Sequence, residues 1–421
     1  MRNHMDQENP IRLSTPRSRD AVFLKLGLIP DIQMIYVAAL ACTRHRNVEL
    51  IELQRQGCLS FLMFDEVDMV TGDYINKTQN AAAQIAAERN PSGIILMTGC
   101  QSALLSTDYG LLTQEIEAEI GVPVRVHDGC RLCGFDEEAP DAGVSPLQQL
   151  PYDFIRPAEK SEVPSVNILG SAAPDENSEL FSVLKNAGVK KINCIAHCKT
   201  REEYQEMGRA HLNIILSAQE MLAGPYLQEK LGIPWVCLGG IYDSGELERS
   251  YQTLEEVLGI SVDISAQKDR LDEKLEAVRH KAGGCTIAVE GDPELAKWLL
   301  RTGFSVTSLQ LSPHQGLSKE QRAWFEENAP ALEIKGTERG GDRSGGEGRG
   351  RGEGRERGEG RGHGEGRGRG EGRGHSEGRG RGEGRNRGEN QERGAAPEIG
   401  FQASIHILET LERAIGGRTH E

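Results

Sequence analysis

The segment Met34-Ile-Tyr-Val-Ala-Ala-Leu-Ala41 is an uninterrupted apolar run without a charged residue. A short run of this kind is typical of a strand that is buried on both faces, as in a parallel sheet. The following stretch 67–88 carries apolar and alanine side chains at helical spacing, and Asn90-Pro-Ser-Gly93 ends it. Buried strands that alternate with amphipathic helices favour an α/β fold with crossover helices.

The same alternation continues along the chain. A strand at 94–98, a helix at 108–120 and a strand at 122–126 complete a first unit. A proline-bearing linker, 146–164, precedes a second unit with strands expected at 165–170, 191–196, 212–216 and 232–238. A third unit has strands expected at 285–290 and 305–311, and a helix at 403–415 resumes it after a repeat.

These patterns divide the chain into five parts. We predict an N-terminal segment at 1–30, a first domain at 31–160, a second at 161–283, a third formed by 284–337 with 395–421, and an insertion at 338–394. The predicted fold class is α/β with mostly parallel sheets and one disordered insertion.

The insertion is a Gly-, Arg- and Glu-rich repeat whose six-residue period starts at Glu347 and recurs from Glu353 to Glu383. Almost nothing apolar lies within it, so it cannot bury enough surface to offset its chain entropy, and we expect it to be disordered. Each Arg has a Glu close by and no aromatic residue is interleaved, which argues against RNA binding. A solvated tether or a relic of repeat expansion is the better interpretation.

The charge balance excludes two classes of partner. The insertion holds 15 of the 49 basic and 12 of the 64 acidic residues, which leaves 34 basic against 52 acidic residues elsewhere. A folded part with a net charge near −18 repels phosphate backbones and anionic lipid headgroups, so we expect no nucleic acid and no membrane partner. Another protein or a small molecule fits this charge better.

The N-terminal stretch 1–19 is polar and has no apolar segment before a cleavage site, and no apolar run approaches membrane-spanning length. The chain has nine cysteines, an odd number, and with 421 residues it is large enough to fold without disulfides. We therefore expect a cytoplasmic protein whose thiols are free for packing, metal binding or chemistry.

Four cysteines follow expected strands of the first unit. Cys42 and Cys100 come just after 34–41 and 94–98, and Cys130 and Cys133 follow 122–126. Ligands of parallel α/β sheets gather beyond the carboxyl ends of the strands, because the loops converge at that edge. Thiolates there suit zinc or an iron–sulfur cluster, and spacing alone does not choose between the two.

The other cysteine signals are weaker. Cys130-Arg-Leu-Cys133 is a single CxxC, so a redox disulfide, half of a zinc site and a structural role all stay open. Cys58 precedes Leu59-Ser60 and is best interpreted as a packed thiol, but it stays a candidate ligand. A metal site around His197 is less favoured than core packing of the remaining thiols, Cys194, Cys198, Cys237 and Cys285.

Nucleotide-binding motifs are missing from the sequence. No Gly-x-Gly-x-x-Gly follows a strand, and no Gly-x-x-x-x-Gly-Lys-Ser/Thr motif is present. We therefore expect neither a dinucleotide nor ATP to bind this chain, and any ATP would be hydrolysed by a partner.

Several short segments, in this order, resemble the nitrogenase component 1 family. In the first unit these are Ala41-Cys-Thr-Arg-His-Arg46, then Leu59-Ser60 leading to Asp65-Glu-Val-Asp-Met-Val-Thr-Gly72, and Thr98-Gly-Cys100. In the second unit, Leu212-Asn-Ile-Ile-Leu-Ser-Ala-Gln-Glu-Met221 and Gly232-Ile-Pro-Trp235 extend the resemblance over most of the chain outside the repeat. It implies three Rossmann-like domains.

The resemblance also implies a function. The chain would be a catalytic-component subunit that takes low-potential electrons from an ATP-dependent iron–sulfur reductase resembling the nitrogenase iron protein. It would pass them through a 4Fe–4S cluster, held within the chain or shared with a like or related subunit, to a substrate in the cleft between domains. Cys42 and Cys100 match the family's cluster-ligand positions, and Cys58, Cys130 or Cys133 would complete the set.

Departures from the family pattern limit this expectation. Ala-Ala-Leu-Ala precedes Cys42 in place of Gly-Pro-x-Gly, and no cysteine lies between Met1 and Ala41 to match a further upstream ligand. Ser217 stands where the dinitrogen-reducing subunit carries the cysteine that anchors its large metal cofactor, and Ser replaces a soft thiolate poorly. We therefore predict that the substrate is not dinitrogen.

Two alternative functions stay open. One is a non-catalytic scaffold that holds a metallocluster or tetrapyrrole precursor during cofactor assembly. The other is a zinc-bound or metal-free binding protein. Turnover with reductase and ATP favours the enzyme, release of an intact cluster to an acceptor favours the scaffold, and iron and sulfide analysis separates both from a zinc protein.

Overall fold

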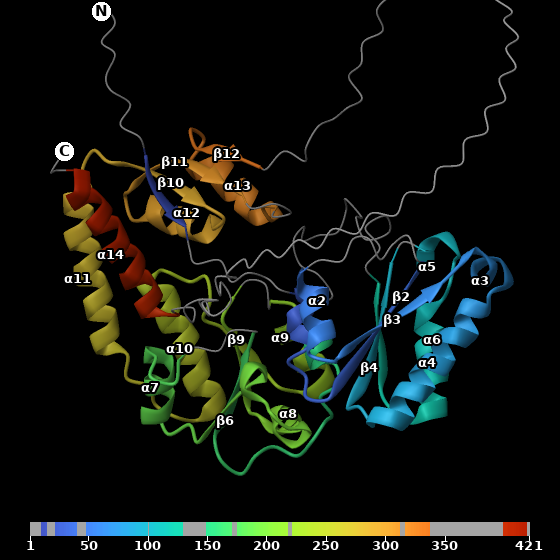
Figure 1. Ribbon diagram of the computed structural model, residues 1–421. Helices are drawn as coiled ribbons and strands as arrows, with labels where there is room; N and C mark the ends of the chain where they lie inside the picture. The colour runs from blue at the N-terminus through green and yellow to red at the C-terminus, as the bar shows by residue number, and fades with distance from the viewer. Residues whose placement is uncertain are drawn as a thin grey trace, which may run out of the picture. The chain divides into compact units, whose positions relative to one another are not determined.

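The computed structural model describes residues 10–14, 22–39, 48–99, 101–128, 149–170, 175–217, 221–311, 316–336 and 399–418. Across these ranges the chain forms three four-stranded sheets in which every neighbouring pair of strands is parallel (Figure 1). The predicted α/β class with parallel sheets is thus confirmed. The insertion 338–394 lies outside the described residues, and the domain boundaries stay a prediction.

The first sheet has the strand order β3-β2-β4-β5. Its strands are β2 (Ile32–Ala39), β3 (Leu59–Phe64), β4 (Gly93–Thr98) and β5 (Val124–Asp128). The two central strands, β2 and β4, are almost completely buried, which explains why their sequences are continuous apolar runs rather than alternating ones. The register pairs Tyr36 with Met97, and because β2 ends at Ala39 and β4 at Thr98, β2 extends two residues further at this end of the sheet.

The helices around this sheet are α1 (Val22–Leu26), α2 (Val48–Arg55), α3 (Glu66–Thr71), α4 (Asp73–Arg89), α5 (Gln101–Leu104) and α6 (Tyr109–Ile120). The helix expected at 67–88 is divided at Gly72, whose φ of 77° ends α3 and begins α4. Glycine adopts this left-handed conformation without steric cost. Asp65 caps α3 in a capping box with Asp68, in which each side chain accepts the other residue's backbone N–H.

The second sheet has the order β7-β6-β8-β9, with β6 (Ser165–Leu169), β7 (Lys191–Cys194), β8 (Leu212–Ile215) and β9 (Trp235–Cys237). A ladder of amides crosses it in register: Asn193 Nδ2 donates to Asn167 Oδ1 at 3.0 Å, and Asn167 Nδ2 donates to Asn213 Oδ1 at 2.9 Å. The surrounding helical segments are η3 (Leu150–Tyr152), α7 (Glu179–Asn186), η4 (Ile195–His197), α8 (Arg201–Glu206), η5 (Met207–Arg209), α9 (Ala223–Leu231) and α10 (Ser244–Leu258).

The third sheet unites distant parts of the chain. Its order is β1-β10-β11-β12, with β1 (Ile11–Ser14), β10 (Thr286–Glu290), β11 (Ser305–Gln310) and β12 (Glu333–Lys335). The helices here are α11 (Ser265–Lys281), α12 (Pro293–Arg301), α13 (Lys319–Asn328) and α14 (Phe401–Arg418). Helix α14, which follows the insertion, lies beside α11 and also contacts β1 (Figure 1). Within the described ranges, no helix combines the length and apolarity needed to cross a bilayer.

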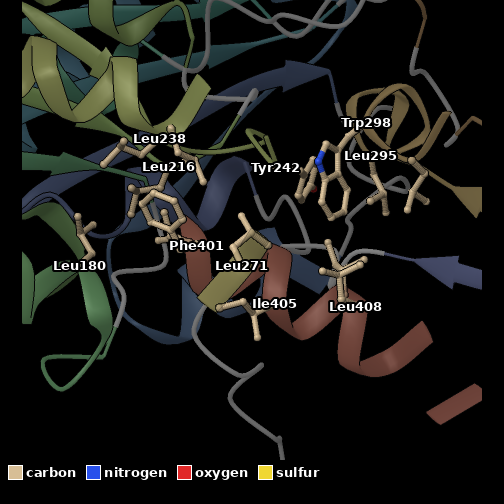
Figure 2. Packing of buried hydrophobic residues seen from close by; sticks show 14 of the residues in the cluster. Leu180, Leu216, Leu238, Tyr242, Leu271, Leu295, Trp298, Phe401, Ile405 and Leu408 are labelled. Carbon is tan, nitrogen blue, oxygen red and sulfur yellow. The ribbon is translucent and has the colours of Figure 1, made fainter. Parts of the chain in front are cut away.

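One large apolar cluster anchors α14. Figure 2 shows Phe401 and Ile405 of this helix among buried side chains that include Leu216 after β8 and Leu271 of α11. Phe401 is completely buried and stacks on Tyr251, with ring centroids 6.0 Å apart. Burying one such aromatic side chain is worth about 1.5–3 kcal/mol. The contact therefore helps to hold α14, which follows the long insertion, against α10, which precedes it.

We predict that Glu412 stabilises the pairing of α14 with α11 in a pH-dependent way. Its carboxylate accepts hydrogen bonds from Lys274 and Lys281 of α11, which lower its pKa to about 2. Because the pKa of Glu412 is lower in the folded than in the unfolded state, its two ion pairs stabilise the folded state fully above the unfolded-state pKa of about 4.3. This stabilisation is lost as the pH falls through the folded-state pKa of about 2. Glu412→Gln should therefore cost less than about 1 kcal/mol at pH 7, since the pair is partly exposed, and less still at pH 3.

Urea unfolding at both pH values measures the difference. Glu409→Gln is the matched control, because Glu409 lies on the same helix and its carboxylate makes no ion pair with a described residue. A destabilisation by Glu412→Gln that is equal at pH 7 and pH 3 contradicts the prediction.

Candidate functional site

The strand order of the first sheet points to a candidate ligand site at the carboxyl ends of its strands. From β2 the chain moves outward to β3 on one side, and then crosses to β4 and β5 on the other side. The order therefore reverses between β2 and β4, and parallel sheets of this kind bind ligands beyond the strand ends at such a reversal. Cys42 follows β2 and Cys100 follows β4, while Cys130 and Cys133 follow β5. These four cysteines themselves lie outside the described residues.

Gly99 and Gln101, the residues directly before and after Cys100, are among those that the structure describes. Gln101 begins α5 and is only 4% exposed, and its Nε2 donates to the carbonyl oxygen of Val37 in β2 at 2.6 Å. Its Oε1 is buried and accepts no hydrogen bond from a described residue. Gly99 leaves the room for this side chain, because a Cβ at Gly99 would lie 2.7 Å from that oxygen. The turn after β4 is thus connected directly to β2.

Cys58 lies at the opposite, amino-terminal end of the strands of the same sheet. It precedes β3, and its backbone oxygen accepts from Met34 N near the start of β2 at 2.7 Å. Its Sγ donates to Leu53 O at 3.3 Å, and burial raises the pKa of the thiol. Since β3 is six residues long, roughly 20 Å separate Cys58 from the carboxyl edge. The structure does not bring Cys58 together with the strand ends that precede the other four candidates.

The remaining described cysteines carry thiols in packed surroundings. Cys198 Sγ donates to the carbonyl oxygen of Cys194 at 3.3 Å, and burial followed by the charge of Glu203 raises the pKa of Cys198 to about 11. Burial also raises the pKa of Cys237, and Cys285 packs against the large apolar cluster. Among the described residues, no group of three or more His, Cys, Asp or Glu side chains could hold a metal ion.

A second reversal of strand order lies between β6 and β8 of the second sheet. Ser217 follows β8 here, and Gly239 after β9 approaches it so closely that a Cβ on Gly239 would lie 1.8 Å from Leu216 O and 2.5 Å from Ser217 N. Cys237 Sγ donates to Gly239 O at 3.3 Å. The polypeptide backbone therefore packs directly against the strand end beside Ser217.

Asp153, between the first and second sheets in sequence, is the acceptor of a dense charge network. Its carboxylate accepts from Arg125 Nε of β5 and from Lys230 Nζ of α9, each at 2.6 Å, and from Tyr226 OH. Burial alone would raise the pKa of Asp153, but Lys230, Tyr226 and Arg125 outweigh burial and hold it below its ordinary value. Arg125 also donates to Glu117 at 2.8 Å. Strand β5 and helix α9 are thus connected through one carboxylate.

Gln101, Asp153 and Gly239 were not predicted from the sequence. The position of Gln101 next to Cys100 was the one available signal for it. Nothing local distinguishes Asp153, whose ion-pair partners are 28 or more residues away, or Gly239, whose close backbone contacts with Leu216 and Ser217 are 22 or more residues away.

Among the comparisons with known proteins, the one with family profiles identifies a family. The sequence profile described as Nitrogenase component 1 type Oxidoreductase matches residues 23–315. A solved structure described as nitrogenase Cp1 at pH 6.5 has a TM-score of 0.53 and 16% sequence identity, and the match covers 80% of this chain and 79% of that one. Another, nitrogenase Cp1 at pH 5, has a TM-score of 0.42 and 15% identity, with 74% and 71% covered. The comparison with curated proteins found no match.

We predict that Gly239→Ala destabilises the second sheet. A Cβ would collide with backbone atoms of Leu216 and Ser217, which no change of rotamer can relieve. The free energy of unfolding should fall by about 2 kcal/mol or more, measured by urea denaturation. Gly417→Ala on α14 is the control, since a Cβ there meets nothing within 4 Å and should be neutral or slightly stabilising. Equal stability of the Gly239→Ala variant and the unaltered protein would refute the close approach.

Proposed function

The chain belongs to the nitrogenase component 1 type oxidoreductases, and on this basis we propose that it passes low-potential electrons through an iron–sulfur cluster to a substrate other than dinitrogen. One observation carries the proposal: Cys42 and Cys100 follow β2 and β4, the neighbouring strands between which the strand order reverses. The two strands lie about 5 Å apart across the sheet, and β2 ends two residues, or roughly 7 Å, beyond β4. This separation of the strand ends is compatible with ligands of a single cluster.

The donor set fits such a cluster. Thiolates are the usual ligands of iron–sulfur clusters, and Cys130 and Cys133 follow β5, the strand next to β4. These two would complete a set of four, a partner subunit being the alternative source. We leave Cys58 out of the set, because it lies at the amino-terminal ends of the strands rather than at their carboxyl ends, and because burial raises the pKa of its thiol. When bound, the cluster would supply a one-electron redox centre.

The role of the chain's own residues is to hold and shield this centre. Strands β2 and β4 place side chains such as Val37 and Met97, which are almost completely buried, beneath the strand ends. A dry apolar floor lowers the local dielectric constant and limits the access of water, both of which influence a reduction potential. Orientation of the ligands and tuning of the potential are therefore the tasks that fall to the protein.

Two partners follow from the proposed function. An ATP-dependent iron–sulfur reductase, similar to the nitrogenase iron protein, would supply the electrons, because the sequence has no nucleotide-binding motif of its own. A like or related subunit would complete the oligomer. The folded part's strong negative charge favours protein partners with basic surfaces over nucleic acid or lipid.

The strand end at the second reversal of strand order, beside Ser217, supports the exclusion of dinitrogen. Ser217 offers a hydroxyl rather than a thiolate after β8, and Gly239 packs its backbone against the residue before it. A large metal cofactor anchored at Ser217 would lack a soft ligand and would compete with this backbone for space.

We predict that Cys100→Ala abolishes cluster incorporation, whereas Cys58→Ala does not. Each variant removes one thiol, Cys100 from the segment after β4 and Cys58 from the segment before β3, so that loss of a cluster ligand is separated from loss of a buried sulfur. The measurement is iron and acid-labile sulfide per chain after anaerobic purification, together with the visible absorption of the cluster. Deletion of residues 347–388 should leave the iron content unchanged.

Several outcomes would overturn the proposal. Unaltered iron content in Cys100→Ala contradicts the ligand assignment. A colourless unaltered protein that carries zinc and no iron excludes electron transfer through this chain. A cluster that no low-potential donor reduces, but that the protein releases intact to an acceptor, identifies an assembly scaffold instead.

A further inference from the structure

We propose that the cavity between α7 and the start of α11 binds a small aliphatic diamine, whose ammonium groups donate to the carboxylates of Glu179 and Asp263. No described residue of the first sheet lines this cavity. The inference therefore goes beyond the proposed function and does not depend on any cysteine.

The cavity has a volume of about 330 Å³, which lies within the range of small-molecule sites. Four residues of α7 line one wall of it: Glu179, Ser182, Val183 and Asn186. Their spacing of three, four and seven residues places them on one face of the helix, along about 10 Å of its axis. This wall is long enough for an extended chain and not only for a single ion.

The charge of the lining selects a cation. Among the described lining residues, Glu179 and Asp263 are acidic and none is Lys, Arg or His. Asp263 Oδ1 accepts from Ser265 N at 3.1 Å and from Ser265 Oγ at 2.7 Å, and these bonds hold the pKa of Asp263 below its ordinary value. This carboxylate is therefore ionised and oriented. An anionic ligand would be repelled by both acidic groups.

The carboxylate of Glu179 is only partly compensated by the protein. Burial raises its pKa, and the backbone N–H of Gln402 and the charge of Arg270 offset this effect in part. The third group that interacts with Glu179 is Tyr251, whose own pKa is raised by burial and by the charge of Glu179. A half-buried carboxylate gains more from an ammonium donor than an exposed one does, because water screens the pair less.

An organic cation fits this lining better than a metal ion does. Within the described part of the chain, no group of three or more His, Cys, Asp or Glu side chains could hold a metal, and hard divalent cations need about six oxygen ligands. Buried Val183 lies between Glu179 and Asn186 along α7 and offers an apolar contact for methylene groups. A four-carbon diamine combines such a centre with two nitrogens roughly 6 Å apart.

The test is isothermal titration calorimetry of the full-length protein with butane-1,4-diamine. Butane-1,4-diol, which has the same chain without the charges, is the control ligand, and Mg²⁺ is the competitor. The diamine should bind at one site per chain, the diol should not bind, and Mg²⁺ should not displace the diamine.

Three variants locate the site. Ser182→Lys places an ammonium group in the cavity from an exposed position and should weaken binding at least about tenfold. Glu179→Gln keeps an acceptor for the N–H of Gln402 and should weaken binding about tenfold. Glu176→Gln, the matched control, removes the same charge from an exposed residue outside the lining and should leave the affinity unchanged. Circular dichroism and the unfolding midpoint verify that each variant is folded, and Ser182→Lys decides where Glu179→Gln is not.

Four results would overturn the inference: no binding of the diamine, equal binding of the diol, displacement of the diamine by Mg²⁺, or equal weakening by Glu179→Gln and Glu176→Gln. The last of these would indicate unspecific attraction to an acidic protein. None of these measurements involves iron or sulfide content, so the diamine site and the proposed cluster succeed or fail separately.

Discussion

The parallel backbone ladder between β2 and β4 is the interaction on which the candidate site depends. It runs from the pair Ile32 and Gly93 to the pair Tyr36 and Met97, beyond which β2 continues to Ala39 and β4 to Thr98. A slip of one residue would turn every side chain of β4 to the other face of the sheet. Gly93 helps to set the register, because a Cβ there would overlap the ring of Phe154. The relative position of the two chain exits follows from this pairing.

Buried amides recur where strand register matters. The ladder of Asn193, Asn167 and Asn213 crosses three strands of the second sheet, and Gln101 joins the exit from β4 to β2 in the first. An amide in a dry interior is costly in any register that leaves it without partners. Buried amides therefore favour one strand register more strongly than apolar side chains do, because an apolar side chain loses no hydrogen bond when the register shifts.

Polar contacts between sequence-distant segments supplement the apolar cores. Asp153 joins Arg125 of β5 to Lys230 of α9, and Arg201 of α8 donates to Asp31 before β2 at 2.8 Å. Because Asp153 accepts from two cations and a phenol, the removal of its carboxylate would leave like charges close together. The contacts of Asp153 hold β5, whose end precedes Cys130 and Cys133, in a defined position relative to helix α9.

The sequence by itself determined the fold class, the buried central strands and the family, because apolar runs and short motifs are local properties. It did not predict β3, whose side chains are mostly only partly buried, or β1, which pairs with β10 some 276 residues later in the chain. Only the tertiary structure decided that Cys58 lies at the other end of the strands from the strand ends that precede the remaining candidates, and that Gln101 bonds to β2. The reason is physical: strand order, register and the partners of a buried amide depend on which distant segments come together, and no local pattern of residues records this.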